Sequence, residues 1–185
     1  ENETVDNGIL FLSSKNIKDQ KLDLTDERFI TEEKFELLGR GKLKREDLII
    51  TVRGSIGNCC IFNHPHFETG FINAQMMILR GNPEFVEPQY LHLISQCSPW
   101  KRQLDILAYG TAQQQLSNLI LANLSFQIPP IREQKQILNH ILSVNLTLER
   151  LIEKNELKLV VLSEYRQSLI SSVVTGKVRV TEDMI

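Results

Sequence analysis

Residues 129–176 read PPIREQKQILNHILSVNLTLERLIEKNELKLVVLSEYRQSLISSVVTG, and between Pro130 and Gly176 this stretch contains no glycine or proline. Proline is tolerated at the start of a helix, and glycine is favoured just beyond a helix end. We therefore predict one helix from Ile131 to Val174. At a rise of about 1.5 Å per residue, this helix is about 60 Å long, which is more than a domain of this size covers along its whole length.

Apolar residues recur along the predicted helix in three neighbouring columns with a seven-residue period. The columns form a stripe that is wider than the seam of a two-stranded coiled coil. The helix either packs on its own domain or pairs with a helix of this molecule or another, and its length favours a partner for the distal half. Asn155 lies within one column, where a buried amide fixes register at a cost in stability or marks a local break in the seam. The candidate interface residues are Ile137, Ile141, Val144, Leu148, Leu151, Ile152, Asn155, Leu159, Leu162 and Leu169.

Residues 1–130 have a different pattern, in which short apolar runs are separated by Gly, Pro and Asn. Runs rich in β-branched or aromatic residues predict strands, and helical spacing after a proline or a threonine cap predicts helices. The predicted strands are Ile9–Leu12, Leu48–Val52, Asn58–Phe62, Ala74–Leu79 and Leu124–Ile128, and the predicted helices are Thr31–Gly39, Pro88–Gln96 and Pro99–Leu107. Because these elements do not alternate strictly, we predict an α+β domain. The domain assignment is residues 1–130 for this domain, 131–176 for the helix and 177–185 for a C-terminal tail.

The composition is that of a globular protein, with 42% hydrophobic residues. No apolar run is long enough to span a membrane, and the first residues lack the pattern of a signal peptide, so we expect a cytoplasmic protein. Cys59, Cys60 and Cys97 do not form a disulfide framework, because their number is odd and two of them are adjacent. We expect free thiols in a reducing compartment.

The formal net charge of −2 argues against a protein that binds nucleic acid through charge alone. Basic residues are nevertheless concentrated between Arg40 and Arg53. This segment is either a solvated turn or a local patch that contacts phosphates while the domain as a whole stays acidic.

Catalytic and cofactor motifs are absent from the sequence. His64-Pro65-His66 has no Cys or acidic cluster at the spacing of metal ligands. Arg53-Gly54-Ser55-Ile56-Gly57 lacks the Lys-Ser/Thr ending of a phosphate-binding loop, and we interpret it as a tight turn. Ile128-Pro129-Pro130-Ile131 has neither the acid or amide nor the aromatic residue of a methyltransferase motif. We predict a protein that is not an enzyme and that holds no cofactor and no metal.

Three stretches of the chain carry a family resemblance. The first is Asp47–Gly57, an apolar run that ends in the Arg-Gly-Ser-Ile-Gly turn. The second runs from Gly110-Thr111-Ala112-Gln113 to Pro129-Pro130-Ile131-Arg132-Glu133-Gln134, and the third from Leu162 to Lys177. In their order and spacing, the three stretches resemble the specificity subunits of type I restriction–modification enzymes, and they cover most of the chain.

The resemblance implies that the chain reads double-stranded DNA. A full specificity subunit has two recognition domains held apart by two antiparallel helices, and each domain reads one half of an interrupted site. The helices set the spacer and dock the modification (methyltransferase) subunits and, through them, the restriction subunit. Family domains usually begin with a further strand-rich segment ahead of residues like 8–12. That segment is absent or abbreviated here. Because this chain has one such domain and one such helix, we expect either a half-subunit that forms a homodimer and reads a palindromic interrupted site, or half of a larger protein.

The resemblance also singles out polar residues as candidate DNA contacts. Arg53 is favoured because it leads directly into a glycine turn. Lysine and arginine contact phosphates, whereas the amides of Asn and Gln offer paired donors and acceptors to adenine. The candidate DNA-binding residues are Lys42, Lys44, Arg45, Arg53, Ser55, Asn73, Gln75, Lys101, Arg102, Thr111, Gln113 and Gln114.

Two other functions stay open. A helix-driven adaptor without a DNA role would depend on Leu148 and Leu162 but not on Arg53 or Gln113. The recognition segment of a fused restriction–methylation enzyme would have its catalytic residues outside this segment.

Overall fold

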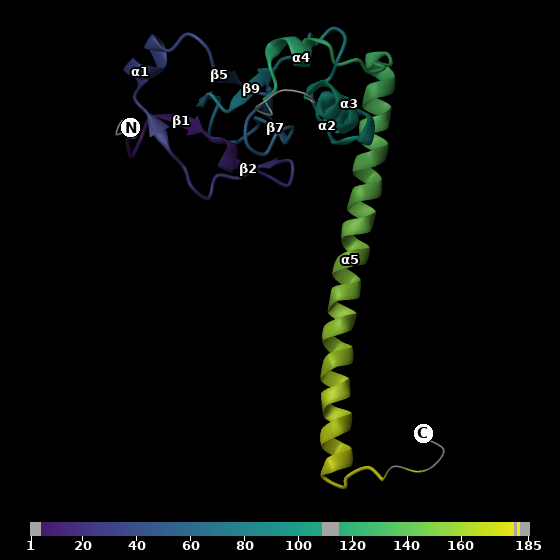
Figure 1. Ribbon diagram of the computed structural model, residues 1–185. Coiled ribbons are helices and arrows are strands. Elements are labelled where there is room, and N and C mark those ends of the chain that lie inside the picture. Colours follow the sequence, from purple (N-terminus) through teal and green to yellow (C-terminus); the bar gives the residue numbers. More distant parts are fainter. Residues whose placement is uncertain (1–4, 109–114, 180, 182–185) are drawn as a thin grey trace. The chain divides into compact units, whose positions relative to one another are not determined.

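The computed structural model describes residues 5–108, 115–179 and 181 (Figure 1). The chain divides into two compact units, Glu1–Leu138 and Asn139–Ile185. The first unit combines short strands with helices, and the second is formed largely by one helix. This arrangement confirms the predicted α+β fold class followed by a long helix.

The elements of the first unit are short. The strands are β1 Ile9–Leu12, β2 Ile17–Lys18, β3 Lys21–Leu22, β4 Phe29–Ile30, β5 Lys42–Lys44, β6 Leu48–Thr51, β7 Cys59–Ile61, β8 Thr69–Ile72 and β9 Met76–Leu79. The helices are α1 Glu32–Leu37, α2 Pro88–Gln96, α3 Ser98–Ala108 and α4 Asn118–Ala122, and a 3-10 turn, η1, spans Ser14–Asn16. Helix α5, Ile131–Val174, begins in this unit and continues into the second.

The strands form two main sheets and one hairpin. One sheet has the order β4-β1-β8-β5, in which β1 and β8 are parallel and the other neighbours are antiparallel. The other has the antiparallel order β7-β6-β9, and β2 pairs with β3. In Figure 1 the labelled β1, β5, β7 and β9 gather in the same unit as α2 and α3.

Strand β6 lies between two hydrophobic clusters. Leu48 and Ile50 belong to one cluster, together with Trp100 and Leu104 of α3. Ile49 belongs to the other, together with Leu10 and Leu12 of β1. Successive side chains of a strand point to opposite faces, so the unbroken apolar run of β6 fills both clusters at once.

The prediction of a strand at Leu124–Ile128 is wrong, because this segment has no regular secondary structure. The side chain of Gln103 forms hydrogen bonds with the main chain of this segment, in place of a neighbouring strand. Gln103 Oε1 accepts from the Ser125 N–H at 2.9 Å, and Gln103 Nε2 donates to the Ser125 carbonyl at 2.7 Å. Leu124 and Phe126 still pack against the first cluster, which explains their apolar character.

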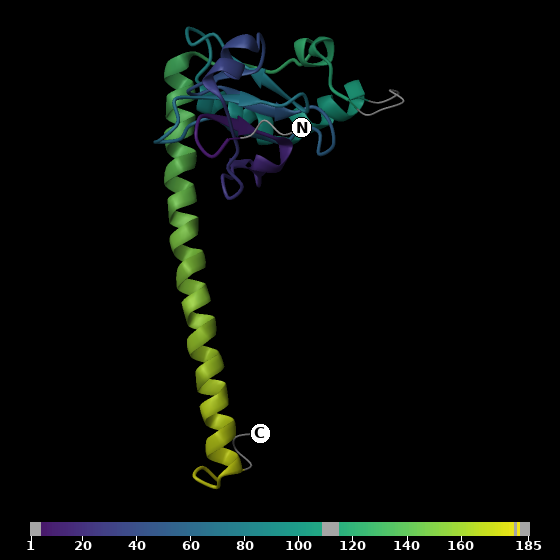
Figure 2. The same cartoon turned by 90° about the vertical axis from the view of Figure 1, so that its left-hand side faces the viewer.

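Helix α5 confirms the predicted bounds Ile131 and Val174, and its ribbon is continuous (Figure 2). It ends in a Schellman motif, in which the Gly176 N–H donates to the Val173 carbonyl at 3.0 Å and the Lys177 N–H to the Ser172 carbonyl at 2.9 Å. Gly176 has a φ of +73°, a conformation that glycine adopts without steric cost.

The first turns of α5 are fastened within the first unit by Gln134, whose side chain is 0% exposed. Its Nε2 donates to the carbonyls of Phe85 at 2.8 Å and Pro129 at 2.7 Å, and its Oε1 accepts from the Glu87 N–H at 2.9 Å. Lys135 adds an ion pair with Glu87 at 3.0 Å. All the hydrogen-bonding groups of the Gln134 amide are therefore engaged except one lone pair on its oxygen.

Among the helices of the described residues, none is both long enough and apolar enough to cross a membrane.

Candidate nucleic-acid interface

Several strands of the first unit end at the same place. Strands β1 and β8 are parallel neighbours, so their C-terminal ends lie together, and the Asn73 N–H donates to the Leu12 carbonyl at 3.0 Å. The Val52 N–H, just after β6, donates to the Gln75 carbonyl at 2.8 Å, and the Val52 carbonyl accepts from Leu116 at 3.1 Å. These bonds bring together residues 13–16, 53–57, 73–75 and 115–117, which we call the loop edge.

The turn from Arg53 to Gly57 exposes two predicted contact residues, Arg53 and Ser55. Gly54 and Gly57 have φ values of +76° and +84°, which confirms the predicted tight turn. A Cβ on Gly57 would also lie 3.0 Å from Leu104 Cδ1, so the turn packs closely on α3. Neither the Arg53 side chain nor the Ser55 hydroxyl bonds to any residue that the structure describes, so both are available to a ligand.

Asn73 and Gln75 form a second polar corner of the loop edge. Asn73 Oδ1 accepts from the Gln75 N–H at 3.0 Å, and Gln75 Oε1 accepts from Asn73 Nδ2 at 3.3 Å and from Ser14 Oγ at 2.9 Å. Within the described parts of the chain, Gln75 Nε2 has no partner. Its amide donors are therefore free to bond to a base edge, while its oxygen is held in place.

A shallow hollow of about 480 Å³ lies beside this corner, and its lining includes Arg40, Asn73, Met77 and Asn118. Arg40 is exposed and contributes a cation next to Asn73. Arg40 was not among the predicted contacts. The reason is that only the pairing of β5 with β8 brings residue 41 next to residue 72, where the Ile72 N–H donates to the Gly41 carbonyl at 3.0 Å.

The strands divide the basic segment Arg40–Arg53 between two ends of the fold. Lys44 and Arg45 precede β6, at the end opposite Val52, and Arg45 Nη2 donates to the His64 carbonyl at 3.3 Å. Lys42 Nζ lies 4.6 Å from the Phe35 ring centroid and 3.4 Å from Glu36 Oε2. Within this segment, only Arg40 and Arg53 are thus adjacent to the loop edge.

The other predicted contacts come from α3 and the segment that follows it. Lys101 and Arg102 are exposed on α3. Thr111, Gln113 and Gln114 lie outside the described residues. Leu116, just beyond them, is buried and bonded to Val52.

The buried titratable groups of the first unit indicate structural roles. Burial raises the pKa of the Cys59 and Cys60 thiols to about 12, which keeps both thiols protonated and unreactive. Burial also lowers the pKa of His92, whose Nε2 lies 3.1 Å from the Gln20 carbonyl. No group of three or more His, Cys, Asp or Glu within the described residues is arranged to hold a metal ion.

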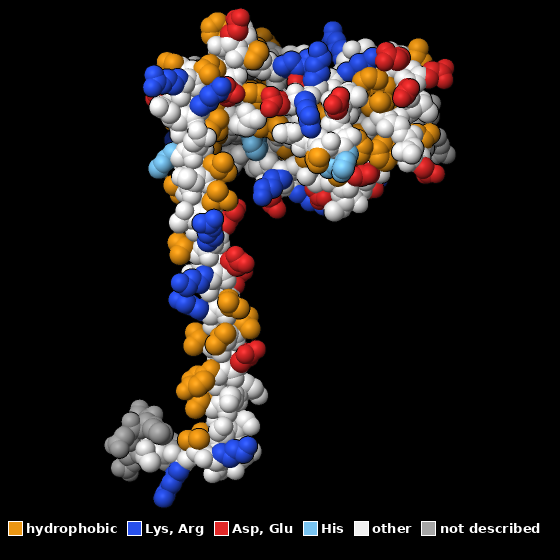
Figure 3. Space-filling view, turned by 180° about the vertical axis from the view of Figure 1, so that it is seen from behind, with side chains coloured by type: hydrophobic (Ala, Val, Ile, Leu, Met, Phe, Trp, Pro, Cys, Tyr) orange, Lys and Arg blue, Asp and Glu red, His pale blue; other side chains and the backbone are white. Residues whose placement is uncertain are grey.

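Most of the predicted interface residues of α5 are apolar and exposed. Leu148 is 50% exposed and Leu162 is 60% exposed. Apolar side chains are visible along this helix in Figure 3. The remaining exposed members of the predicted set are Val144, Leu151, Ile152, Asn155, Leu159 and Leu169, whereas Ile137 and Ile141 are half-buried.

Comparison with known proteins identifies the family of this chain. The model of the type I restriction modification DNA specificity domain matches residues 3–159. The chain belongs to this family. The specificity subunit of the type I restriction enzyme EcoBI from Escherichia coli is 25% identical over 139 residues, which are 74% of this chain and 28% of that protein. This specificity-domain chain thus spans less than a third of its curated relative.

Two solved structures share the fold of this family member. A chain from a study of complex assembly and conformational transition in the type I R-M system has a TM-score of 0.65 and 17% identity, over 90% of this chain and 38% of that one. The HsdS subunit from Thermoanaerobacter tengcongensis has a TM-score of 0.56 and 18% identity, over 77% of this chain and 31% of that one. Both comparisons support the arrangement of a mixed domain with a long helix.

Proposed function

We propose that this specificity-domain chain is a non-catalytic, cytoplasmic DNA-reading module that recognises one half of a bipartite site. The observation that carries the proposal is the loop edge, where an exposed arginine turn and the amide pair Asn73 and Gln75 are joined by main-chain bonds. An arginine can contact phosphate and so position a protein on DNA, and a positioned amide can read a base edge. In this proposal Arg53 and Arg40 contact the phosphate backbone of the DNA, and Gln75 reads a base.

The proposal extends to the partners of the chain. Helix α5 pairs with a second long helix, which belongs either to a copy of this chain or to a second recognition half. The paired helices set the distance between the half-sites and dock the modification subunit, which recruits the restriction subunit. The exposed apolar stripe on α5 supports this part of the proposal, because a helix with such a stripe gains stability by burying it against a partner.

The decisive experiment is expression of this chain with its cognate modification subunit, followed by mapping of adenine methylation across the host genome. The expected result is an interrupted methylated motif that is absent when the modification subunit is expressed alone. A palindromic motif supports pairing with a second copy, and an asymmetric motif indicates a second, different recognition half. A stable complex with no new motif would contradict DNA reading and favour the adaptor function.

Gln75→Ala tests the base-reading role within the same system. If Gln75 bonds to one base, this variant relaxes the motif at one position, at a cost of about 1–3 kcal/mol in discrimination. Gln89→Ala is the matched control, because Gln89 is an exposed amide on α2 that bonds to Glu46 at 3.3 Å. An unchanged motif in Gln75→Ala would remove Gln75 from the base contacts.

A further inference from the structure

A hollow of about 440 Å³ lies on the first unit, between η1 and the Arg53–Gly57 turn. Its lining includes Ser14, Lys15, Lys18, Asp26 and Ser55. Among these residues only Ser55 was predicted to contact DNA, because the others are distant from it in the sequence. The hollow adjoins the base-reading corner, since Ser14 Oγ donates to Gln75 Oε1 at 2.9 Å.

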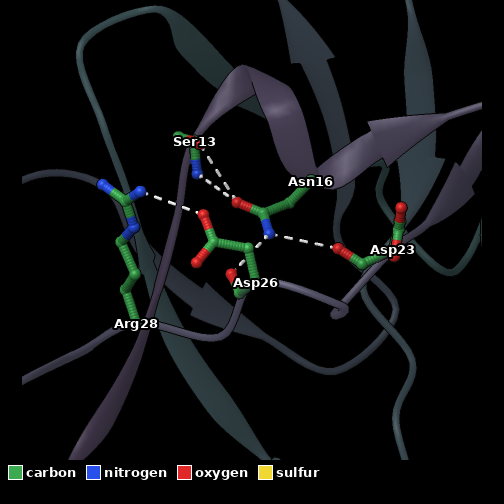
Figure 4. Close-up of polar contacts among 5 residues, drawn as sticks. All are labelled: Ser13, Asn16, Asp23, Asp26 and Arg28. Atoms are coloured by element: carbon green, nitrogen blue, oxygen red, sulfur yellow. Dashed lines mark hydrogen bonds and ion pairs between the residues drawn. The ribbon is translucent and has the colours of Figure 1, made fainter.

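The main chain that carries Ser14 and Lys15 is held firmly by Asn16, which is 5% exposed (Figure 4). Asn16 Oδ1 accepts from the Ser13 N–H at 2.9 Å and from Ser13 Oγ at 3.1 Å. Its Nδ2 donates to the carbonyls of Asp23 at 3.1 Å and Asp26 at 3.3 Å. A buried amide with both ends bonded fixes the turn, so Lys15 projects from a rigid support.

The acidic groups near the hollow are already paired. Asp26 Oδ2 accepts from Arg28 Nη2 at 2.9 Å. Asp23 forms an ion pair with Lys18, and hydrogen bonds from Lys18 and from the Thr25 main chain lower the pKa of Asp23 to about 2. Lys15 is exposed and forms no ion pair with any described residue, so its charge is left for an anion from outside.

We propose that this hollow binds one phosphodiester group of duplex DNA, with the Lys15 ammonium and the Ser55 hydroxyl as its contacts. The inference rests on the proposed function, which places the loop edge against DNA. Two independent segments, one after β1 and one after β6, supply the cation and the hydroxyl. Because Ser14 bonds to Gln75, a phosphate held in the hollow sets the register in which Gln75 meets a base edge.

The test compares the complete chain with Lys15→Gln in fluorescence-anisotropy titrations at several chloride concentrations. Two labelled duplexes are used, one that contains the methylated motif and one of scrambled sequence. A single phosphate contact contributes about −0.9 to the slope of log K against log salt, which corresponds to about a five-fold change in affinity at about 0.15 M salt. We expect Lys15→Gln to weaken binding to both duplexes by this factor and to reduce both slopes by about one unit.

Lys21→Gln is the matched control, because Lys21 is an exposed lysine of β3 that does not line the hollow. We expect this control to keep the wild-type slope, and thermal melts of both variants to match the wild type. An unchanged slope in Lys15→Gln would overturn the phosphate site, as would a loss confined to the motif duplex. If the wild-type chain shows no preference for any motif, sequence reading fails, and the scrambled duplex still decides whether Lys15 contacts phosphate.

Discussion

At the scale of single residues, Asp47 is a buried charged residue of the first unit, and its carboxylate is 2% exposed. Arg80 Nε and Nη2 each donate to one oxygen of Asp47 at 2.6 Å, and the Lys44 N–H donates at 2.7 Å. Burying a carboxylate costs free energy unless such donors replace water. The arginine therefore compensates the burial of Asp47 at the beginning of β6.

We expect Arg80→Gln to lower the free energy of unfolding by roughly 1–3 kcal/mol, because it leaves the buried Asp47 carboxylate without its cation. Urea denaturation of the complete chain measures the change. Arg45→Gln is the control, since Arg45 makes a single 3.3 Å bond to a carbonyl, and it should cost much less. In the double variant Asp47→Asn/Arg80→Gln the two losses should be less than additive. Full additivity would show that the pair is not coupled.

At the scale of elements, much of the fold could be predicted from sequence patterns. Strand β6 and helix α2 have the predicted positions, because an apolar run and a proline start are local signals. Strands β2, β3, β4, β5 and β8 were missed, and Lys18, Lys42 and Lys44 interrupt the apolar pattern of β2 and β5. Strand β5 depends on its pairing with β8, which is remote in the sequence, whereas β2 pairs with the neighbouring β3.

The candidate interface was predictable only in part, for the same reason. The turn at Arg53 has a local glycine signal, and the family resemblance marked Arg53 as a candidate DNA contact. Lys15 and Arg40 have no glycine signal of this kind, and tertiary pairing places Lys15 in the loop edge and Arg40 beside it. A polar turn directly after a buried strand, as at Ser13–Asn16 after β1, is the clue that could have found Lys15.

The start of α5, which lies within the first unit, gives a prediction at the scale of an element. Gln134→Glu keeps the shape of the side chain but turns its two-donor group into a second acceptor that faces the Phe85 and Pro129 carbonyls. We expect the segment before α5 to loosen and to become sensitive to limited proteolysis between Leu124 and Gln134. The matched control is Gln136→Glu, an exposed position two residues further along the helix. Equal protection of both variants would contradict the anchoring role.

At the scale of the whole molecule, most of the large hydrophobic side chains that are exposed among the described residues lie on α5. Burial of a leucine side chain contributes about 1.5–3 kcal/mol, so several columns of exposed leucine, isoleucine and valine provide a strong drive for association. A two-fold pair buries every position of the stripe twice, once in each copy. Under the proposed function, self-association through α5 would bring together two copies of the recognition domain.

We expect the complete chain to be a dimer at micromolar concentration in sedimentation equilibrium, and Leu162→Asp to be a monomer, because the substitution places a charge within the stripe on both copies. Gln167→Asp introduces the same charge at a position outside the three columns and should remain dimeric. If Leu162→Asp dimerises like the wild type, the stripe is not the interface. A wild-type chain that stays monomeric would instead assign the stripe to a different partner helix. In that case the methylated motif should be asymmetric, because the two recognition halves would differ.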